Sequence, residues 1–232
     1  MRLDKYLSSG GELSRTEAKS AIRSGRAAVN GVAAEKGDMQ IDPEKDEITL
    51  DGKHVLYSKY VYIMLNKPAG VVSATEDGRS ETVLDLLPDK YKKLGLFPCG
   101  RLDKDTVGLM ILTNDGKLAH NMLSPKHHVE KVYYFTTEKP VENVDILESG
   151  VKIGKDIMTR PCVIDQISEY EGEITLTEGK YHQIKLMFEA VGNKIVYLKR
   201  IRFAGIPLDE SLAESCWRLL SDDEVKTILQ YK

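Results

Sequence analysis

The sequence predicts an α+β protein with two domains, and three observations lead to this prediction. The chain has 232 residues, which is more than one minimal module needs. Its beginning has the pattern of a compact helix-and-hairpin module, whereas from about residue 60 short strand-like runs alternate with helical segments. No Gly-rich dinucleotide loop and no phosphate-loop pattern interrupts this alternation. We therefore expect a small domain over residues 1–58 and a larger one over residues 59–232, built on a mixed, mostly antiparallel β-sheet with flanking helices.

A short helix is well marked in the small domain. Ser14 and Glu17 have the spacing of a capping box, and Gly25 suits the C-terminal end of the helix. The dipeptide Asn30-Gly31 is the turn signal of a tight β-hairpin. Helix and hairpin together predict a compact unit.

One face of this helix is basic. Apolar Ala18, Ala21 and Ile22 follow the helical period, which leaves the charged positions towards another face. From the charge pattern alone, such a face is more often a solvated surface than a binding site. The basic residues are Arg15, Lys19, Arg23 and, just beyond the helix, Arg26.

Hydrophobic periodicity and turn residues define the other elements. The last helix begins with a second capping box, Ser221 with Glu224. Strands are expected over residues 47–52, 61–65, 108–113, 129–137, 158–167, 173–177 and 194–203, and helices over residues 117–123, 141–149, 181–191 and 222–230.

Composition and charge restrict the possible functions. The chain is 41% hydrophobic and 30% charged, which is enough for a packed core and unlike a disordered protein. Its net charge of −3 argues mildly against nucleic-acid binding, which is usually associated with an excess of basic residues. A local basic face can still bind RNA while acidic residues elsewhere keep the protein soluble.

The location and the metal content can also be predicted. The charged beginning and the lack of an apolar run of about 20 residues predict a cytoplasmic protein with no membrane partner. The three cysteines form no Cys-x-x-Cys pair, so we expect them to be reduced and not to bind zinc. His127 and His128 are adjacent and lack a third ligand at a useful spacing, so no metal site is expected.

The small domain resembles the S4 RNA-binding domain. The resemblance rests on the run Arg2-Leu3-Asp4-Lys5-Tyr6-Leu7, on Ser14-Arg15-x-x-Ala18 and on Gly25-Arg26-x-x-Val29-Asn30-Gly31. In that family the second helix and the hairpin lie against structured RNA. The resemblance therefore implies RNA contacts for Arg15, Lys19, Arg23 and Arg26.

The segment over residues 97–116 carries the most specific motif. It is a polar, turn-rich loop that leads into an apolar strand, a setting in which a rigid sheet can hold a carboxylate. An Arg two residues from an Asp is by itself usually a surface ion pair. The complete string Gly100-Arg101-Leu102-Asp103, then Thr106-x-Gly108-Leu109 and Leu112-Thr113-Asn114-Asp115-Gly116, resembles the active-site motif of pseudouridine synthases.

Further motifs of that family occur in the expected order over residues 60–232. They are Lys67-Pro68-x-Gly70, Glu130-Lys131-x-Tyr133, Gly179-x-Tyr181-His182-Gln183-Ile184-Lys185-x-Met187-Phe188, Val191-Gly192-Asn193 and Leu198-x-Arg200. With the S4-like module, they resemble the bacterial RsuA/RluB/RluE/RluF family of ribosomal RNA enzymes. The run Ser124-Pro125-Lys126-His127-His128, together with Lys185, is most similar to the 16S rRNA pseudouridine(516) synthase type, and 23S rRNA is the alternative substrate.

This resemblance assigns roles to particular residues. Asp103 is the catalytic carboxylate, and Lys185 is the cation that keeps it charged and oriented. Tyr133 offers the uracil a ring for stacking and a hydroxyl. Arg101 contacts the RNA backbone or fills the space left by the extruded nucleotide, and Leu198 closes the apolar side of the pocket.

Two further assignments are less specific. Lys67 supports the active-site loop or contacts a phosphate of the substrate. Lys199, Arg200 and Arg202 add a phosphate-contacting patch or form a solvated strand edge.

The chemistry implied by the resemblance needs few components. Pseudouridine formation breaks the bond from N1 to C1′, turns the uracil and rejoins it through C5, with no redox step, metal or cofactor. Asp103 can attack the sugar, attack the uracil or remove a sugar proton, and these routes remain open. We expect a monomer that acts on 16S rRNA or on a small-subunit assembly intermediate, with a non-catalytic ribosome-assembly protein as the alternative from another class.

Overall fold

The computed structural model describes residues 1–9, 13–55, 57, 59–154 and 157–232. It divides into two compact units. The first comprises residues 1–61 together with 87–96, and the second comprises residues 62–86 and 97–232. The expected domain boundary at residue 58 lies outside the described residues.

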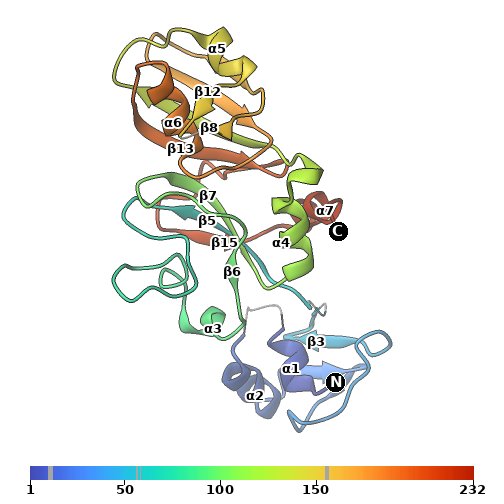
Figure 1. Ribbon diagram of the computed structural model, residues 1–232. Coiled ribbons are helices and arrows are strands. Elements are labelled where there is room, and N and C mark those ends of the chain that lie inside the picture. Colours follow the sequence, from blue (N-terminus) through green and yellow to red (C-terminus); the bar gives the residue numbers. More distant parts are fainter. Residues whose placement is uncertain (10–12, 56, 58, 155–156) are drawn as a thin grey trace. The chain divides into compact units, whose positions relative to one another are not determined.

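The first unit consists of helices beside a small antiparallel sheet (Figure 1). The capping box of the second helix is confirmed, because the Ser14 side chain accepts from the backbone of Glu17 while the Glu17 carboxylate accepts from the backbone of Ser14. The expected hairpin is confirmed too, with Asn30 and Gly31 both at positive φ. The helices are α1 (Leu3–Leu7), α2 (Arg15–Arg23) and α3 (Asp89–Lys92), and the sheet has the order β2 (Val32–Ala33), β1 (Ala27–Val29), β3 (Ile48–Leu50) and β4 (Lys53–His54).

The core of this unit comes from one face of α2 packed on α1 and the sheet. Ala18 and Ile22 are buried on that face, together with Leu3 and Leu7 of α1 and Ile48 of β3. Since the apolar face is directed inwards, the basic side chains of α2 remain in solvent.

The second unit is organised around one nine-stranded sheet (Figure 1). The main strands run in the order β11 (Val163–Gln166), β12 (Glu171–Leu176), β8 (Lys131–Thr137), β13 (Ile195–Phe203), β7 (Val107–Thr113), β5 (Tyr62–Lys67) and β15 (Trp217–Leu219), with β14 (Ile206–Pro207) paired to β13 and β6 (Phe97–Pro98) paired to β7. Among the described strands only β13 and β7 pair in parallel, which confirms the prediction of a mixed, mostly antiparallel sheet.

Helices flank this sheet. Helix α6 (Gln183–Ala190) contacts β13, α5 (Val144–Ser149) contacts β11 and α7 (Asp222–Leu229) contacts β14. The side-chain amide of Asn121 in α4 (Gly116–Leu123) donates to the carbonyl of Tyr231, which connects α4 to the segment after α7. The short 3₁₀ helix η1 (Pro125–His127) follows α4, and the expected helices therefore all form.

The strand expected over residues 158–167 is wrong in part. The chain instead forms β10 (Ile157–Met158), which pairs with β9 (Lys152–Ile153), and then enters β11 at Val163. Between them, Thr159 and Cys162 bond to Val151 and Glu148, and Pro161 has no N–H to offer a sheet. The apolar run is thus shared between two different sheets.

A close approach between two strands of the sheet depends on Gly108. Its φ is 98°, and a Cβ at this position would lie 2.4 Å from the backbone oxygen of Arg200. Only glycine therefore allows β7 to pair with β13 at this point, where Gly108 lies opposite Arg200. This contact joins the strand that follows the Asp103 loop to the strand that carries Leu198.

Two absences concern the described part of the chain. None of its helices has the length and apolar character that a bilayer crossing requires. Over the same residues, no three His, Cys, Asp or Glu side chains gather in a way that could hold a metal ion.

Candidate active site

Asp103 lies on the loop between β6 and β7, and a buried lysine fixes the path of that loop. Lys67, at the end of β5, is fully buried and donates from Nζ to the backbone oxygens of Asp103, Lys104 and Thr106 at 3.1, 3.3 and 2.8 Å, and to its neighbour Pro68 at 3.0 Å. Burial lowers the pKa of the Lys67 amine to about 8. The ammonium group of Lys67 thus binds three carbonyls of the loop and fixes its sharp turn.

Two roles were expected for Lys67, support of the active-site loop or contact with a phosphate of the substrate. Its amine faces the backbone of the loop, and Lys67 is not among the residues that line the neighbouring cavity. The geometry therefore favours support of the loop.

A second set of bonds holds the loop from the other side. The Ser73 hydroxyl donates to the carbonyl of Leu102 at 2.8 Å and accepts from its N–H at 3.0 Å. The N–H of Gly70 donates to the carbonyl of Lys104 at 2.7 Å. Asp103 therefore projects from a loop that is bonded on both flanks.

The Asp103 carboxylate meets two basic side chains. Nζ of Lys185 in α6 lies 3.0 Å from one oxygen, and Nε2 of His182, just before that helix, lies 3.4 Å from the other. Lys185 also contacts Asp105 at 2.6 Å. Burial acts to lower the pKa of Lys185, but its bonds to Asp105 and Asp103 outweigh this effect and raise the pKa. Lys185 is thus held as a cation beside Asp103.

His182 is a contact that sequence reasoning did not assign. It adopts a left-handed conformation with φ 49° at the start of α6, and its ring stacks on Tyr181 with centroids 3.8 Å apart. The motif containing His182 was visible in the sequence, but the unusual backbone that turns its ring towards Asp103 was not.

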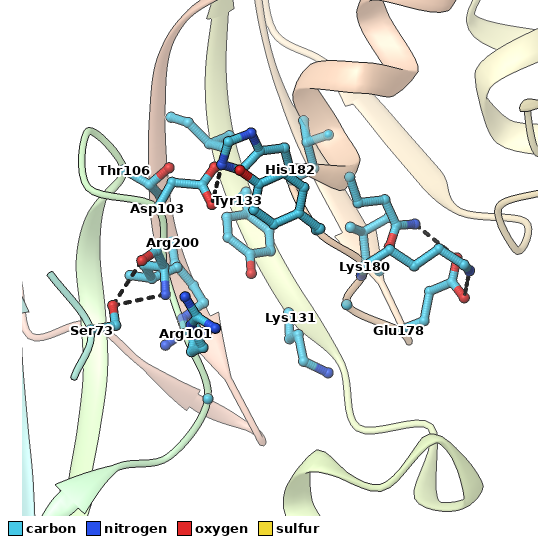
Figure 2. Close-up of a pocket in the computed structure, with 18 of the residues that line it drawn as sticks. Ser73, Arg101, Asp103, Thr106, Lys131, Tyr133, Glu178, Lys180, His182 and Arg200 are labelled. Carbon is cyan, nitrogen blue, oxygen red and sulfur yellow. Dashed lines mark hydrogen bonds and ion pairs between the residues drawn. The ribbon is translucent and has the colours of Figure 1, made fainter. Parts of the chain in front are cut away.

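The side chain of Asp103 lines a cavity of about 720 Å³. Tyr133 on β8 and Leu198 on β13 line it from the sheet, and both side chains are almost entirely buried. In Figure 2, Asp103, Tyr133 and His182 lie close together in one part of the cavity. Arg101 lines the same cavity and is exposed, whereas Tyr134 on the opposite face of β8 bonds to Glu171 instead. Five expected side chains, Arg101, Asp103, Tyr133, Lys185 and Leu198, are therefore brought together.

The charge of this cavity differs from that of the whole chain. Six Lys or Arg residues line it against three Asp or Glu residues, namely Arg101, Lys104, Lys131, Lys180, Lys185 and Arg200 against Asp77, Asp103 and Glu178. The chain as a whole has a net charge of −3. The acidic balance of the sequence is thus reversed locally, which suits a polyanionic ligand.

The basic patch expected at Lys199, Arg200 and Arg202 does not form. Strand β13 lies between β8 and β7, so it is no sheet edge, and Arg200 is only 1% exposed. Side chains alternate along a strand, and Arg200 therefore faces the cavity rather than the outer surface.

The basic face of α2 belongs to the first unit. Arg15, Lys19, Arg23 and Arg26 are all exposed. Arg26 forms a two-pronged ion pair with Asp51, and Lys19 lies 3.9 Å from Asp4. Within the described residues Arg15 and Arg23 form no ion pair, so their charges are available to a ligand.

Comparison with protein families gives two matches. The model described as RNA pseudouridylate synthase matches residues 61–190, and the model of the S4 domain matches residues 1–57. The S4 match covers the motifs of the small domain. The synthase match covers the motifs of the larger domain as far as Phe188, and the motifs at residues 191–193 and 198–200 lie beyond it.

Curated relatives match along their whole length. An uncharacterized RNA pseudouridine synthase of Bacillus subtilis is 44% identical, with 97% of each chain covered. A ribosomal small subunit pseudouridine synthase A of Pasteurella multocida is 40% identical over 98% of this chain and 99% of the relative. The protein of the same name in Escherichia coli is 38% identical over 99% of this chain and 100% of the relative.

A solved structure agrees with these matches. The crystal structure of a pseudouridylate synthase is similar with a TM-score of 0.70 at 36% sequence identity, and it covers 98% of this chain and 99% of its own. The similarity extends over both units, so the fold is shared along almost the whole chain.

Proposed function

This chain belongs to the RNA pseudouridylate synthase family, and from that membership we propose that it converts one uridine of 16S ribosomal RNA into pseudouridine. That it is a pseudouridine synthase follows from the family; the choice of RNA is the proposal. Two relatives that match over almost their full length bear the name ribosomal small subunit pseudouridine synthase A, which supports small-subunit RNA as the substrate. The resemblance to the pseudouridine(516) synthase type makes position 516 of that RNA our proposed target.

Asp103 is proposed as the catalytic group. The observation that carries this assignment is the position of the carboxylate, which is a quarter exposed, lies 3.0 Å from Lys185 and lines a cavity of about 720 Å³. A charged, oriented carboxylate can act as a nucleophile or as a base. Attack on the sugar, attack on the uracil and removal of a sugar proton all begin from this ionised form.

The neighbouring side chains are proposed to hold the nucleotide. Tyr133 offers its ring and hydroxyl to the uracil, and Leu198 closes the apolar side. A uridine reaches such a cavity only after it leaves its stack, because its sugar and base edges are otherwise covered. Arg101, which is exposed at the cavity, contacts the RNA backbone or fills the vacated space.

The first unit is proposed to bring the RNA to this site. Its S4 match and the exposed basic residues Arg15, Lys19, Arg23 and Arg26 support binding to structured RNA. We assign residues 1–58 to this RNA-binding role and residues 59–232 to catalysis. Isomerisation consumes no second substrate, so we propose that the enzyme needs no cofactor. We also propose that it acts as a monomer in the cytoplasm, where ribosomal subunits are assembled.

The substrate proposal is tested by mapping pseudouridine after incubation of the purified protein with 16S rRNA, 23S rRNA and partly assembled small subunits, all free of the modification. We expect one new pseudouridine, in 16S rRNA or the assembling subunit. A new pseudouridine in 23S rRNA alone would support the synthase activity but contradict the proposed 16S rRNA substrate. RNA binding without any new pseudouridine would favour an assembly protein.

A further inference from the structure

Two buried cations line the catalytic cavity away from Asp103. Lys131 on β8 is 9% exposed and Arg200 on β13 is 1% exposed, and both contribute to the cavity wall. Arg200 pairs directly with Tyr133 across the two strands, and Lys131 lies two positions from Tyr133. Because side chains alternate along strands, Lys131, Tyr133 and Arg200 share one face of the sheet. In Figure 2, Lys131 lies further along the strand of Tyr133.

Neither Lys131 nor Arg200 forms an ion pair with an acidic side chain among the described residues, although the charge of Glu178 acts on Lys131. Nζ of Lys131 donates to the carbonyl of Val129 at 2.7 Å, which leaves two of its three donors unused. Lys67, by contrast, uses its buried amine on four backbone oxygens.

The guanidinium of Arg200 is also incompletely bonded. Its Nε donates to the carbonyl of Leu109 at 2.7 Å, and Nη2 lies 3.8 Å from the sulfur of Met110. Nη1 has no protein partner among the described residues. Arg200 lines the cavity, so Nη1 is available to a ligand there.

Both side chains also pack on one aromatic ring. Nζ of Lys131 lies 5.6 Å from the ring centre of Phe203, and the guanidinium carbon of Arg200 lies 4.8 Å from it. Burial, and then the charge of Arg200, lower the pKa of Lys131 to about 8. Two like charges are thus held together at low exposure, an arrangement that an anion between them would relieve.

We infer that Lys131 and Arg200 form a phosphate subsite, which binds a backbone phosphate next to the target uridine. This inference rests on the proposed function, since it takes the occupant of the cavity to be a nucleotide of RNA. A uracil ring is neutral and needs no pair of cations, whereas each phosphate of RNA carries a negative charge. The subsite would fix the sugar-phosphate chain while Tyr133 and Asp103 address the base and sugar.

A competing account makes the pair structural, with both cations present only to pack on Phe203. The two accounts differ for Lys131→Met and Lys131→Arg. Methionine keeps most of the length and the packing but removes the charge, whereas arginine keeps the charge and the donors. Lys126→Met is the matched control, because Lys126 is exposed in η1 and does not line the cavity.

The test compares binding of uridine, uridine 3′,5′-bisphosphate and inorganic phosphate to the full chain by calorimetry, with thermal unfolding measured for each variant. We expect the bisphosphate to bind the wild type and Lys126→Met about tenfold or more tightly than uridine. That advantage should fall about tenfold in Lys131→Met and return in Lys131→Arg.

Three results would overturn the subsite. The first is an advantage of the bisphosphate that Lys131→Met retains. The second is equal loss in Lys131→Met and Lys131→Arg together with equal loss of thermal stability, which is the structural result. The third is inorganic phosphate binding as tightly as the bisphosphate, which would assign the site to a free anion. No turnover is involved, so the outcome is independent of which ribosomal RNA the enzyme modifies.

Discussion

Asp103 and Asp105 stand two positions apart on one loop, and both contact the amine of Lys185. Their surroundings differ. Asp103 lines the cavity with its side chain 25% exposed, whereas Asp105 is 74% exposed and does not line it. The loop bonds to Lys67 and Ser73 create this difference, because they set the direction in which each carboxylate projects. The two aspartates therefore form a natural pair for mutational comparison.

Lys185→Met should lower the rate of pseudouridine formation about 10- to 100-fold, because it removes the charged hydrogen bond to Asp103. Lys185→Arg keeps the positive charge and should lose less. The measurement is the single-turnover rate at saturating RNA for both variants. A methionine variant as active as the arginine variant would show that the charge of Lys185 does not act on the reaction.

One buried carboxylate, that of Asp115, caps the N-terminus of helix α4. Asp115 accepts from the N–H of Leu118, from the hydroxyl of Tyr62 and from the amine of Lys232. Burial acts to raise the pKa of Asp115, but these bonds outweigh it and hold the pKa below its usual 3.8. The carboxylate therefore couples a helix terminus, a strand and the chain end.

Asp115→Asn should change how stability depends on pH. The folded pKa of Asp115 is below the unfolded value, so its contribution to stability is present above pH 3.8 and lost as the pH falls below that value. Wild type should exceed the variant in unfolding free energy by about 1–3 kcal/mol at neutral pH. Urea unfolding at neutral pH and near pH 3 tests this, and an equal difference at both pH values would refute it.

The contact between β7 and β13 gives a prediction about backbone geometry. Gly108→Ala should destabilise the protein by about 3 kcal/mol or more, because a Cβ there meets the backbone of Arg200 and φ is positive. Gly116→Ala is the control, since a Cβ at the start of α4 meets no atom within 4 Å. We expect Gly116→Ala to be neutral within about 1 kcal/mol by denaturant unfolding. Equal effects of the two substitutions would mean that the close approach is unimportant.

Elements set by local sequence were predictable, and those set by distant contacts were not. Both capping boxes and the Asn30-Gly31 hairpin depend on neighbours within a few residues, and all three form as predicted. The burial of Arg200 depends on where β13 inserts between β7 and β8, which no local pattern reveals. The orientation of His182 depends on a left-handed backbone conformation that no local sequence pattern reveals.

The division of labour between the two units can be tested separately from the chemistry. Arg15 and Arg23 are exposed and form no ion pair within the described residues. The double variant Arg15→Ala/Arg23→Ala should weaken RNA binding and flatten its salt dependence by about 0.7–0.9 per lost phosphate contact in a log–log plot. The rate at saturating RNA should remain unchanged. Filter-binding titrations and single-turnover rates provide both values, with the exposed Lys45→Ala as a control on the same unit.

An equal fall in the saturated rate and the affinity would contradict this separation of roles.

At the scale of the whole chain, the sequence motifs predicted the family and the character of the sheet, and both are confirmed. Charge was the least informative signal, because the acidic total concealed a basic cavity that forms only when residues from several strands and loops meet.

We propose that the Asp103 carboxylate performs the isomerisation. Single-turnover pseudouridine formation in small-subunit ribosomal RNA by wild type, Asp103→Asn and Asp105→Asn, with RNA affinity measured in parallel, tests this assignment. We predict that Asp103→Asn binds RNA but forms no pseudouridine, while Asp105→Asn remains active because its carboxylate lies outside the cavity. An active Asp103→Asn enzyme, or an equal loss of activity in both variants, would contradict the assignment of Asp103.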